Sequence, residues 1–159
     1  MTDTARWREI VASTLDWEQA HVGLDRALEE LPTQLRGRRP GGAPFSIWEE
    51  LEHIRIAQRD LLDFCRDPDY EHDLAWPGDY WPTSPEPPSP GAWDESLEGI
   101  RRDRDALKRW TVEAEVDLTS EIPWGTGQTY LRTILTALDH AAYHTGQIVL
   151  IRKLLGAWG

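Results

Sequence analysis

Leu138 to Trp158 read LDHAAYHTGQIVLIRKLLGAW, the stretch that carries the most regular hydrophobic pattern of the chain. From Ile134 to Leu155, apolar side chains recur at alternating intervals of three and four residues. This spacing lines one face of an α-helix with apolar groups. We expect the helix to begin near Thr126 or Thr129 and to end near Gly156, since glycine suits the left-handed position after a helix.

Three further segments show helical periodicity, separated by connections rich in Pro and Gly. They span about residues 4–31, 46–67 and 92–116. Ser46 followed by Glu49 is a capping-box pattern, which marks the start of the second segment. The first segment shows an unbroken apolar stripe and therefore predicts one continuous helix. We predict an all-α protein, folded as a single domain over residues 1–159, and find no strand signal.

The longest irregular connection, residues 68–91, contains the sequence WPGDYWP at positions 76–82. Connections of this length without regular structure are uncommon in compact domains. Its aromatic side chains would bury apolar area by contacting the helices. We therefore expect this connection to pack onto the helices.

Composition and charge exclude several classes of protein. With 40% hydrophobic and 28% charged residues, the chain has the composition of a globular domain. A net charge of −11 would repel a phosphate backbone, so we expect no nucleic-acid partner. No apolar run approaches the roughly 20 residues that span a bilayer, so we expect no membrane partner. The polar N-terminus lacks the apolar core of a signal peptide, which favours a cytoplasmic location.

Histidines, rather than cysteines, carry the strongest chemical signal. Cys65 is the only cysteine, so Cys-rich zinc modules are excluded. His140 and His144 lie one helical turn apart and can reach a single ion. His53, on the second helix, is the third candidate ligand. Three neutral imidazoles leave at least one coordination position open, which is typical of a catalytic site. We predict one divalent metal ion per chain on these three residues.

Two better-known metal motifs do not fit the sequence. The zincin pattern needs Glu directly after the first His of the pair, and Ala141 occupies that position. A di-iron bundle needs Glu-x-x-His on two helices; Glu50 and His53 form one such pair, but Ala137 and Ala141 lie three residues before His140 and His144. A mononuclear site remains. Three imidazoles do not select one metal, so we expect Zn or Ni first and leave Fe, Mn and Co open.

Three more polar residues, His21, Gln58 and Gln147, are candidates for a pocket or for contacts that support the metal ligands. His21 falls on the apolar stripe of the first segment, where it could hydrogen-bond a substrate or could be an ordinary core histidine. Glu50 and Asp139 could accept a hydrogen bond from the second ring nitrogen of a ligand histidine. His72 lies between Glu71 and Asp73 and is expected to be exposed.

The segments SIWEELEHIRIAQRDLLDF, residues 46–64, and LDHAAYHTGQIVLIRKLLGAW, residues 138–158, together resemble the DinB/YfiT-like superfamily. WPGDYWP at 76–82 and LDWEQAH at 15–21 resemble one branch of it. The resemblance implies an up-down-down-up four-helix bundle and frequent homodimerisation. It also implies a metal held by one histidine of the second helix and the His-x-x-x-His pair of the last, which correspond to His53, His140 and His144.

The resemblance further implies thiol chemistry, since some relatives are bacillithiol transferases, mycothiol-dependent isomerases and other S-transferases. The expected function is a metal-dependent transferase that uses a low-molecular-weight thiol and an electrophilic substrate. Two alternatives stay open: a hydrolase whose metal activates water, and a non-catalytic metal-binding or ligand-binding module of a stress response. The sequence offers no decisive catalytic base for either reaction.

Overall fold

The computed structural model describes residues 3–159, with side chains from residue 5 onward. Within these residues the fold is entirely helical and contains no strand, which confirms the all-α prediction. The α-helices are α1 (Asp3–Thr14), α2 (Leu24–Leu28), α3 (Ile47–Arg66), α4 (Ala92–Glu113) and α5 (Tyr130–Leu154). Two 3-10 turns, Thr33–Leu35 and Gly78–Tyr80, lie in the connections. No helix of the described chain is both long enough and apolar enough to cross a bilayer.

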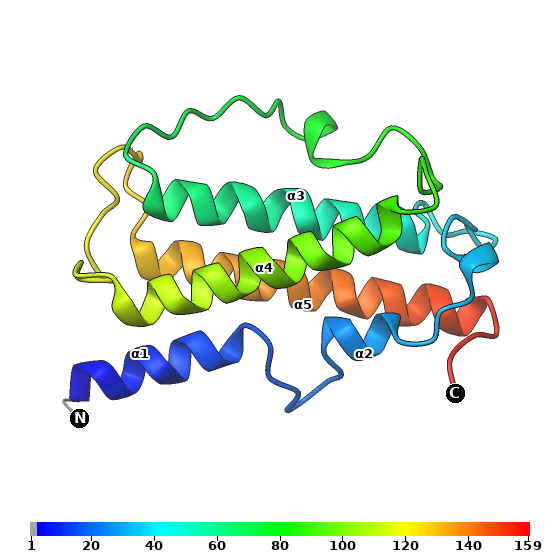
Figure 1. Cartoon of the computed structure of the whole chain (residues 1–159), viewed down its shortest axis with the longest axis horizontal. Coiled ribbons are helices and arrows are strands. Elements are labelled where there is room, and N and C mark those ends of the chain that lie inside the picture. Colours follow the sequence, from blue (N-terminus) through cyan, green and yellow to red (C-terminus); the bar gives the residue numbers. More distant parts are fainter. Residues whose placement is uncertain (1–2) are drawn as a thin grey trace.

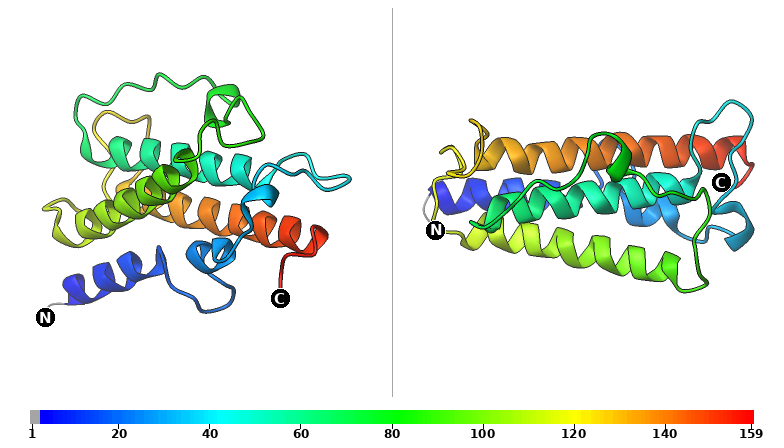
Figure 2. Two further views of the ribbon diagram at one scale, coloured as in Figure 1. Left: turned by 45° about the vertical axis from the view of Figure 1, so that its right-hand side comes forward. Right: turned by 90° about the horizontal axis from the view of Figure 1, so that it is seen from above.

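The long helices pack side by side, with α3 in contact with both α4 and α5 (Figures 1 and 2). The pair α1 and α2 closes the other side, α1 against α4 and α2 against α5. Figure 1 shows α3 and α4 running in one direction, whereas α1, α2 and α5 run in the opposite direction. The two metal-binding candidate segments, on α3 and α5, are therefore direct neighbours.

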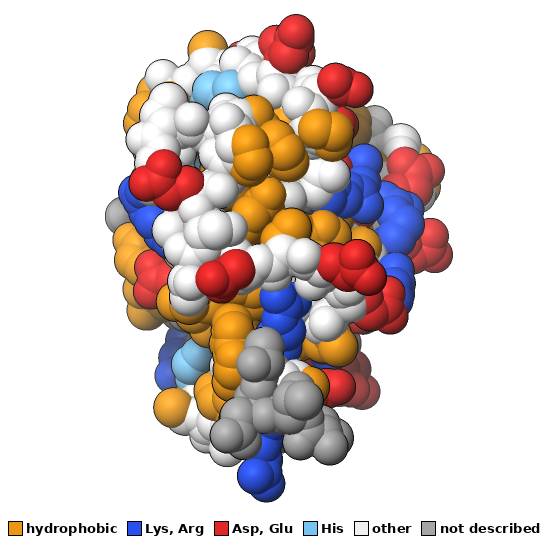
Figure 3. All heavy atoms as spheres, turned by 90° about the vertical axis from the view of Figure 1, so that its left-hand side faces the viewer, with side chains coloured by type: hydrophobic (Ala, Val, Ile, Leu, Met, Phe, Trp, Pro, Cys, Tyr) orange, Lys and Arg blue, Asp and Glu red, His pale blue; other side chains and the backbone are white. Residues whose placement is uncertain are grey.

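The interior contains two apolar clusters, one in each half of the bundle. In the first, Leu51 and Ile54 of α3 pack with Ile148 and Ile151 of α5. The second joins the other halves of the same helices through Leu62 and Ile134, together with α4. Figure 3 views the molecule from the end where α1 begins, and hydrophobic side chains reach the surface there between charged ones. Burial of each aliphatic side chain contributes about 1.5–3 kcal/mol, which fixes α3 against α5.

Caps define the ends of the two helices that carry the histidines. The Ser46 hydroxyl accepts from the Glu49 amide at 3.2 Å, and the Glu49 carboxylate accepts from the Ser46 amide at 2.8 Å. This reciprocal pair is the predicted capping box. At α5, the Thr129 hydroxyl accepts from the Arg132 amide at 3.2 Å, and Gly156 follows the helix at φ +68°. Both predicted ends of α5 are confirmed.

The prediction of one continuous helix over residues 4–31 is wrong, because residues 15–23 separate α1 from α2. Local side-chain contacts accompany the break. At the end of α1, the Ser13 and Thr14 hydroxyls donate to backbone carbonyls three residues earlier, satisfying groups that a longer helix would use. The Gly23 amide donates to the Glu18 carboxylate at 3.0 Å instead of to a helical carbonyl. His21 consequently lies in an exposed connection and not on an inward helix face.

The connection between α3 and α4, residues 67–91, runs along the outer side of α3 (Figures 1 and 2). Side-chain hydrogen bonds attach it at several points. The hydroxyls of Tyr70 and Tyr80 both donate to the carboxylate of Asp60 at 2.6 Å. The Ser46 hydroxyl donates to the carbonyl of Pro85 at 2.6 Å. The expected packing of this connection onto the helices is therefore observed.

Candidate metal centre

The three candidate ligands converge between α3 and α5. His53, His140 and His144 each present a ring nitrogen, and these nitrogens all lie within 4.8 Å of one another. Nε2 of His53 and Nε2 of His140 are 2.9 Å apart. His140 and His144 occupy successive turns of α5, so both reach the point where α3 contributes His53. The fold thus brings together residues 87 positions apart in the sequence.

In two of the three imidazoles, the ring nitrogen that points away from the cluster makes a hydrogen bond. Nδ1 of His53 donates to the backbone carbonyl of Tyr80 at 2.8 Å. Nδ1 of His144 donates to Oε2 of Glu50 at 2.6 Å. Both hydrogen bonds use Nδ1, which leaves the lone pair of Nε2 available to coordinate a metal. Glu50 is only 3% exposed, whereas Asp139 lies at the surface of α5.

Burial favours the neutral form of two of these imidazoles, those of His53 and His140. His53 and His144 are buried, and His140 is partly buried. Burial, together with the neighbouring His144 and His53, lowers the pKa of His140 to about 4. Burial also lowers the pKa of His53, against the opposing effect of its hydrogen bond to Tyr80. Neutral imidazole is the form that coordinates a metal, so at neutral pH at least these two ligands need lose no proton.

Aromatic side chains flank the histidine cluster. Trp81 stacks on His53 with ring centroids 3.9 Å apart and planes within 3°, and it meets His144 edge-on at 5.9 Å. Phe45 stacks on Trp81 in turn, at 3.8 Å. On α5, Tyr143 contacts His144 edge-on at 4.9 Å. Sequence reasoning did not place Trp81 or Phe45 at the site, although WPGDYWP had been singled out as part of a connection that packs on the helices.

The family model of the DinB superfamily matches residues 16–148, which include all three histidines and most of the chain. The chain belongs to the DinB superfamily. The resemblance seen in the sequence is thereby confirmed. No curated protein and no solved structure matched the chain.

The histidine cluster of this DinB-superfamily chain fits a metal ion in both spacing and chemistry. Two nitrogens bound to one ion at about 2.0–2.1 Å lie about 2.9 Å apart at a right angle and about 3.4 Å apart in a tetrahedron. The 2.9 Å between the Nε2 atoms of His53 and His140 lies at the lower end of this range. Neutral imidazole nitrogen is a common ligand of divalent transition metals. The cluster can therefore hold such an ion with small side-chain adjustments.

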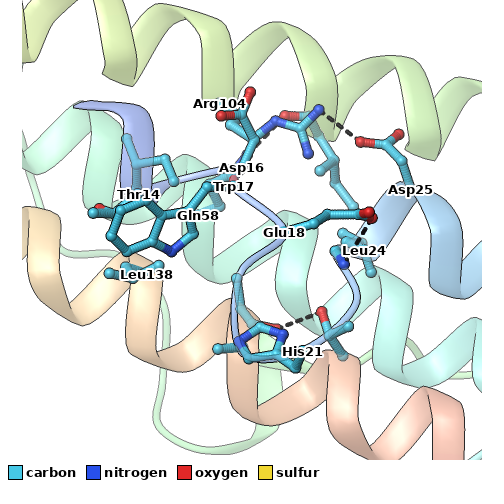
Figure 4. Close-up of a pocket in the computed structure, with 16 residues that line it drawn as sticks. Thr14, Asp16, Trp17, Glu18, His21, Leu24, Asp25, Gln58, Arg104 and Leu138 are labelled. Atoms are coloured by element: carbon cyan, nitrogen blue, oxygen red, sulfur yellow. Dashed lines mark hydrogen bonds and ion pairs between the residues drawn. The ribbon is translucent and has the colours of Figure 1, made fainter. Parts of the chain in front are cut away.

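Two other candidates from the sequence, His21 and Gln58, line a separate pocket of this DinB-superfamily fold. The pocket has a volume of about 170 Å³ and is also lined by Trp17, Arg104 and Leu138 (Figure 4), and its lining includes none of the three histidines. Gln58 is buried and donates to the Ile100 carbonyl at 2.8 Å, while Nδ1 of His21 lies 2.8 Å from the Val22 carbonyl oxygen. Gln147 is partly buried on α5. His72 is exposed, as expected.

Proposed function

We propose that this protein binds one divalent metal ion per chain through Nε2 of His53, His140 and His144. The observation that carries the proposal is the convergence of the three rings while Tyr80 and Glu50 hold the outer nitrogens of two of them. Such outer contacts fix the tautomer and orientation of metal-binding imidazoles. Zn or Ni is the proposed ion, and Fe, Mn and Co suit the same ligands. The directions of the helices in Figure 1 also support the up-down-down-up arrangement implied by the family.

We further propose that the protein is a transferase that joins a low-molecular-weight thiol to an electrophilic substrate. When bound, a divalent ion with an open position lowers the pKa of a thiol and favours its nucleophilic thiolate form. The chain itself cannot supply this thiol. Cys65 is 1% exposed, and burial raises the pKa of its thiol to about 12. It also lies twelve residues beyond His53, about 18 Å along a straight helix.

The surroundings of the cluster suit transfer better than hydrolysis. Trp81 stacks on His53 with Phe45 stacked on it in turn, and Tyr143 flanks His144, so aromatic rings that could contact an apolar electrophilic substrate lie beside the cluster. Glu50, the carboxylate in contact with the cluster, is engaged by His144 and serves to position that ring. We assign no catalytic acid or base. Hydrolysis and metal binding without turnover, as in a stress-response module, remain the alternatives.

Cobalt(II) substitution distinguishes these possibilities. Adding a low-molecular-weight thiol to the cobalt(II) protein should produce a sulfur-to-cobalt charge-transfer band, and His140→Ala should abolish it. Cys65→Ser is the matched control and should leave the band intact. Turnover of an electrophile with the same thiol then separates a transferase from a binding module. Absence of the band with every biological thiol tested would contradict the thiol proposal and favour hydrolysis or binding alone.

We propose a second copy of this chain as the partner on the outer face of α5. Four large apolar side chains are exposed there, at fractions of 44–63%: Leu135, Tyr143, Leu150 and Leu154. At 100° per residue they fall within an arc of about 100° and form one face. Light scattering should give the mass of a dimer, and Leu150→Glu should give that of a monomer. A monomeric wild-type protein at micromolar concentration would refute this partner.

A further inference from the structure

A second pocket lies on the outer side of α3, away from the histidine cluster. We call it the Asp60 pocket, and it has a volume of about 360 Å³. Its charged and aromatic lining residues are Asp60, Phe64, Tyr70, His72 and Trp124. Asp60 follows His53 by seven residues, about 10.5 Å along the helix and near the same face. The connection of residues 67–91 contributes to both places, through Tyr70 here and Trp81 at the cluster.

Asp60 carries a negative charge without a fixed cationic partner. Its side chain is 15% exposed, and both carboxylate oxygens accept tyrosine hydroxyls at 2.6 Å. Among the described residues its ion-pair contact is with His72, at 3.9 Å, and no Lys or Arg nitrogen forms one. Asp63, one turn further on, contacts both Arg59 and Arg66. A mostly buried carboxylate that lacks such a partner favours the approach of a positive charge.

The tyrosine hydroxyls lower the cost of burying this charge but do not neutralise it. Burial and the hydrogen bonds to Asp60 raise the pKa of both Tyr70 and Tyr80, so the phenols stay protonated and act as donors. Nδ1 of His72 lies 3.0 Å from the Tyr70 oxygen. These contacts leave Asp60 as the anionic residue in the lining of the pocket.

Aromatic rings form the walls, and the backbone holds them in place. The Phe64 and Tyr70 rings lie 5.2 Å apart between centroids at an angle of 60°. The indole N–H of Trp124 donates to the Phe64 carbonyl at 2.8 Å, which fixes the ring. A Cβ at Gly125 would lie 3.0 Å from the Phe64 ring and 2.9 Å from the Gln128 amide oxygen, so a glycine allows this close approach. The walls are therefore formed before any ligand arrives.

We propose that the Asp60 pocket binds a small organic cation, an alkylated ammonium group of the size of choline. The faces of Trp, Tyr and Phe attract such cations, and a nearby carboxylate adds direct charge attraction. A bare inorganic cation is a poorer match, because Ca²⁺ and Mg²⁺ require six or more oxygen ligands and the Asp60 oxygens already accept two hydroxyls. The proposal does not depend on metal binding at the histidines.

Choline and its uncharged carbon isostere, dimethylbutanol, form the decisive pair of probes, since they share a shape and differ in charge. Calorimetric titration should show choline binding at least about tenfold more tightly than the isostere. The measurement is repeated with a chelator present, and the preference should persist. Equal affinity for the two probes, or binding of neither in the millimolar range, would overturn the proposal.

Matched variants assign the preference to the pocket. Asp60→Asn should sharply lower the choline preference but leave a remainder from the aromatic faces. Asp63→Asn, at an acidic residue on the same helix that does not line the pocket, should retain the full preference. Tyr70→Phe keeps the ring but removes one attachment of the connection, and it should also retain the preference. Equal losses in Tyr70→Phe and Asp60→Asn would overturn the proposal, since they would assign the effect to the attachment of the connection.

A further variant keeps the proposal testable if Asp60→Asn does not fold. Trp124→Leu removes one aromatic face but leaves the carboxylate in place. It should lower the affinity for choline by a larger factor than the affinity for the isostere. An equal loss for both probes would contradict a role for the aromatic face in recognising charge.

Discussion

Replacing Glu50 by glutamine tests how the buried carboxylate supports the metal centre. The substitution preserves the size of the side chain but removes the charge that faces Nδ1 of His144 at 2.6 Å. The side chains of Glu50 and His144 are only 4% and 10% exposed, so solvent screens this contact little. Loss of such an outer contact typically costs about 10–100-fold in metal affinity, or about 1.4–2.7 kcal/mol.

Competition with a chelator of known affinity measures this loss directly. The matched control is Asp139→Asn, since Asp139 adjoins His140 in the sequence but lies at the surface. We expect the affinity of Glu50→Gln to fall within the stated range and that of Asp139→Asn to stay within about twofold of wild type. Unchanged affinity in Glu50→Gln, or an equal loss in the control, would refute the idea that the buried carboxylate positions the ligand.

The remaining predictions concern stoichiometry, pH and folding. Elemental analysis should find one divalent ion per chain. Alanine at any of the three cluster histidines should sharply lower the metal content, whereas His72→Ala should not. Full occupancy in His144→Ala would contradict the ligand set. Metal-free protein should lose stability as the pH falls from about 6.5 toward 4. The pKa of His140 is about 4 in the folded protein and about 6.5 in the unfolded chain. The unfolded chain therefore binds more protons in this range, which favours unfolding. Thermal melts across that range test the sign, and a stability that rises on acidification would be inconsistent with neutral buried imidazoles. Ser46→Ala should lower the free energy of unfolding by about 0.5–2 kcal/mol through loss of the capping box, measured by urea denaturation.

Periodicity predicted the helices whose apolar face and end signals in the sequence agree with how they pack in the fold. The apolar face of α5 and the capping box of α3 each fix a helix locally, and packing of those same faces against each other brings His53 to the His140 and His144 pair. Spacing on α5 alone therefore sufficed to bring two candidate ligands together, and the third candidate followed once α3 and α5 were taken as neighbours.

The parts that sequence reasoning missed depend on individual hydrogen bonds. The three-and-four spacing continues through residues 15–23, so it gave no sign of the break after Thr14, within which the Gly23 amide bonds to the Glu18 carboxylate. Gly23 itself was the available signal. The stacking of Trp81 on His53 depends on the path of an irregular connection, which has no periodicity from which to predict it. Its aromatic content indicated contact with the helices but not the point of contact.

Tyr80 links the histidine cluster to the 67–91 connection through two hydrogen bonds, and this link has a thermodynamic consequence. Its backbone carbonyl holds the ring of His53, while its hydroxyl bonds to Asp60. Order in the 67–91 connection is thus coupled to the orientation of the His53 ring. If the connection in its ordered state raises the affinity for an ion by holding His53, the bound ion must favour that ordered state by the same factor. Metal binding should therefore suppress local opening of this segment. Amide hydrogen exchange around Trp81 should therefore slow when metal is added, even though the backbone there coordinates nothing.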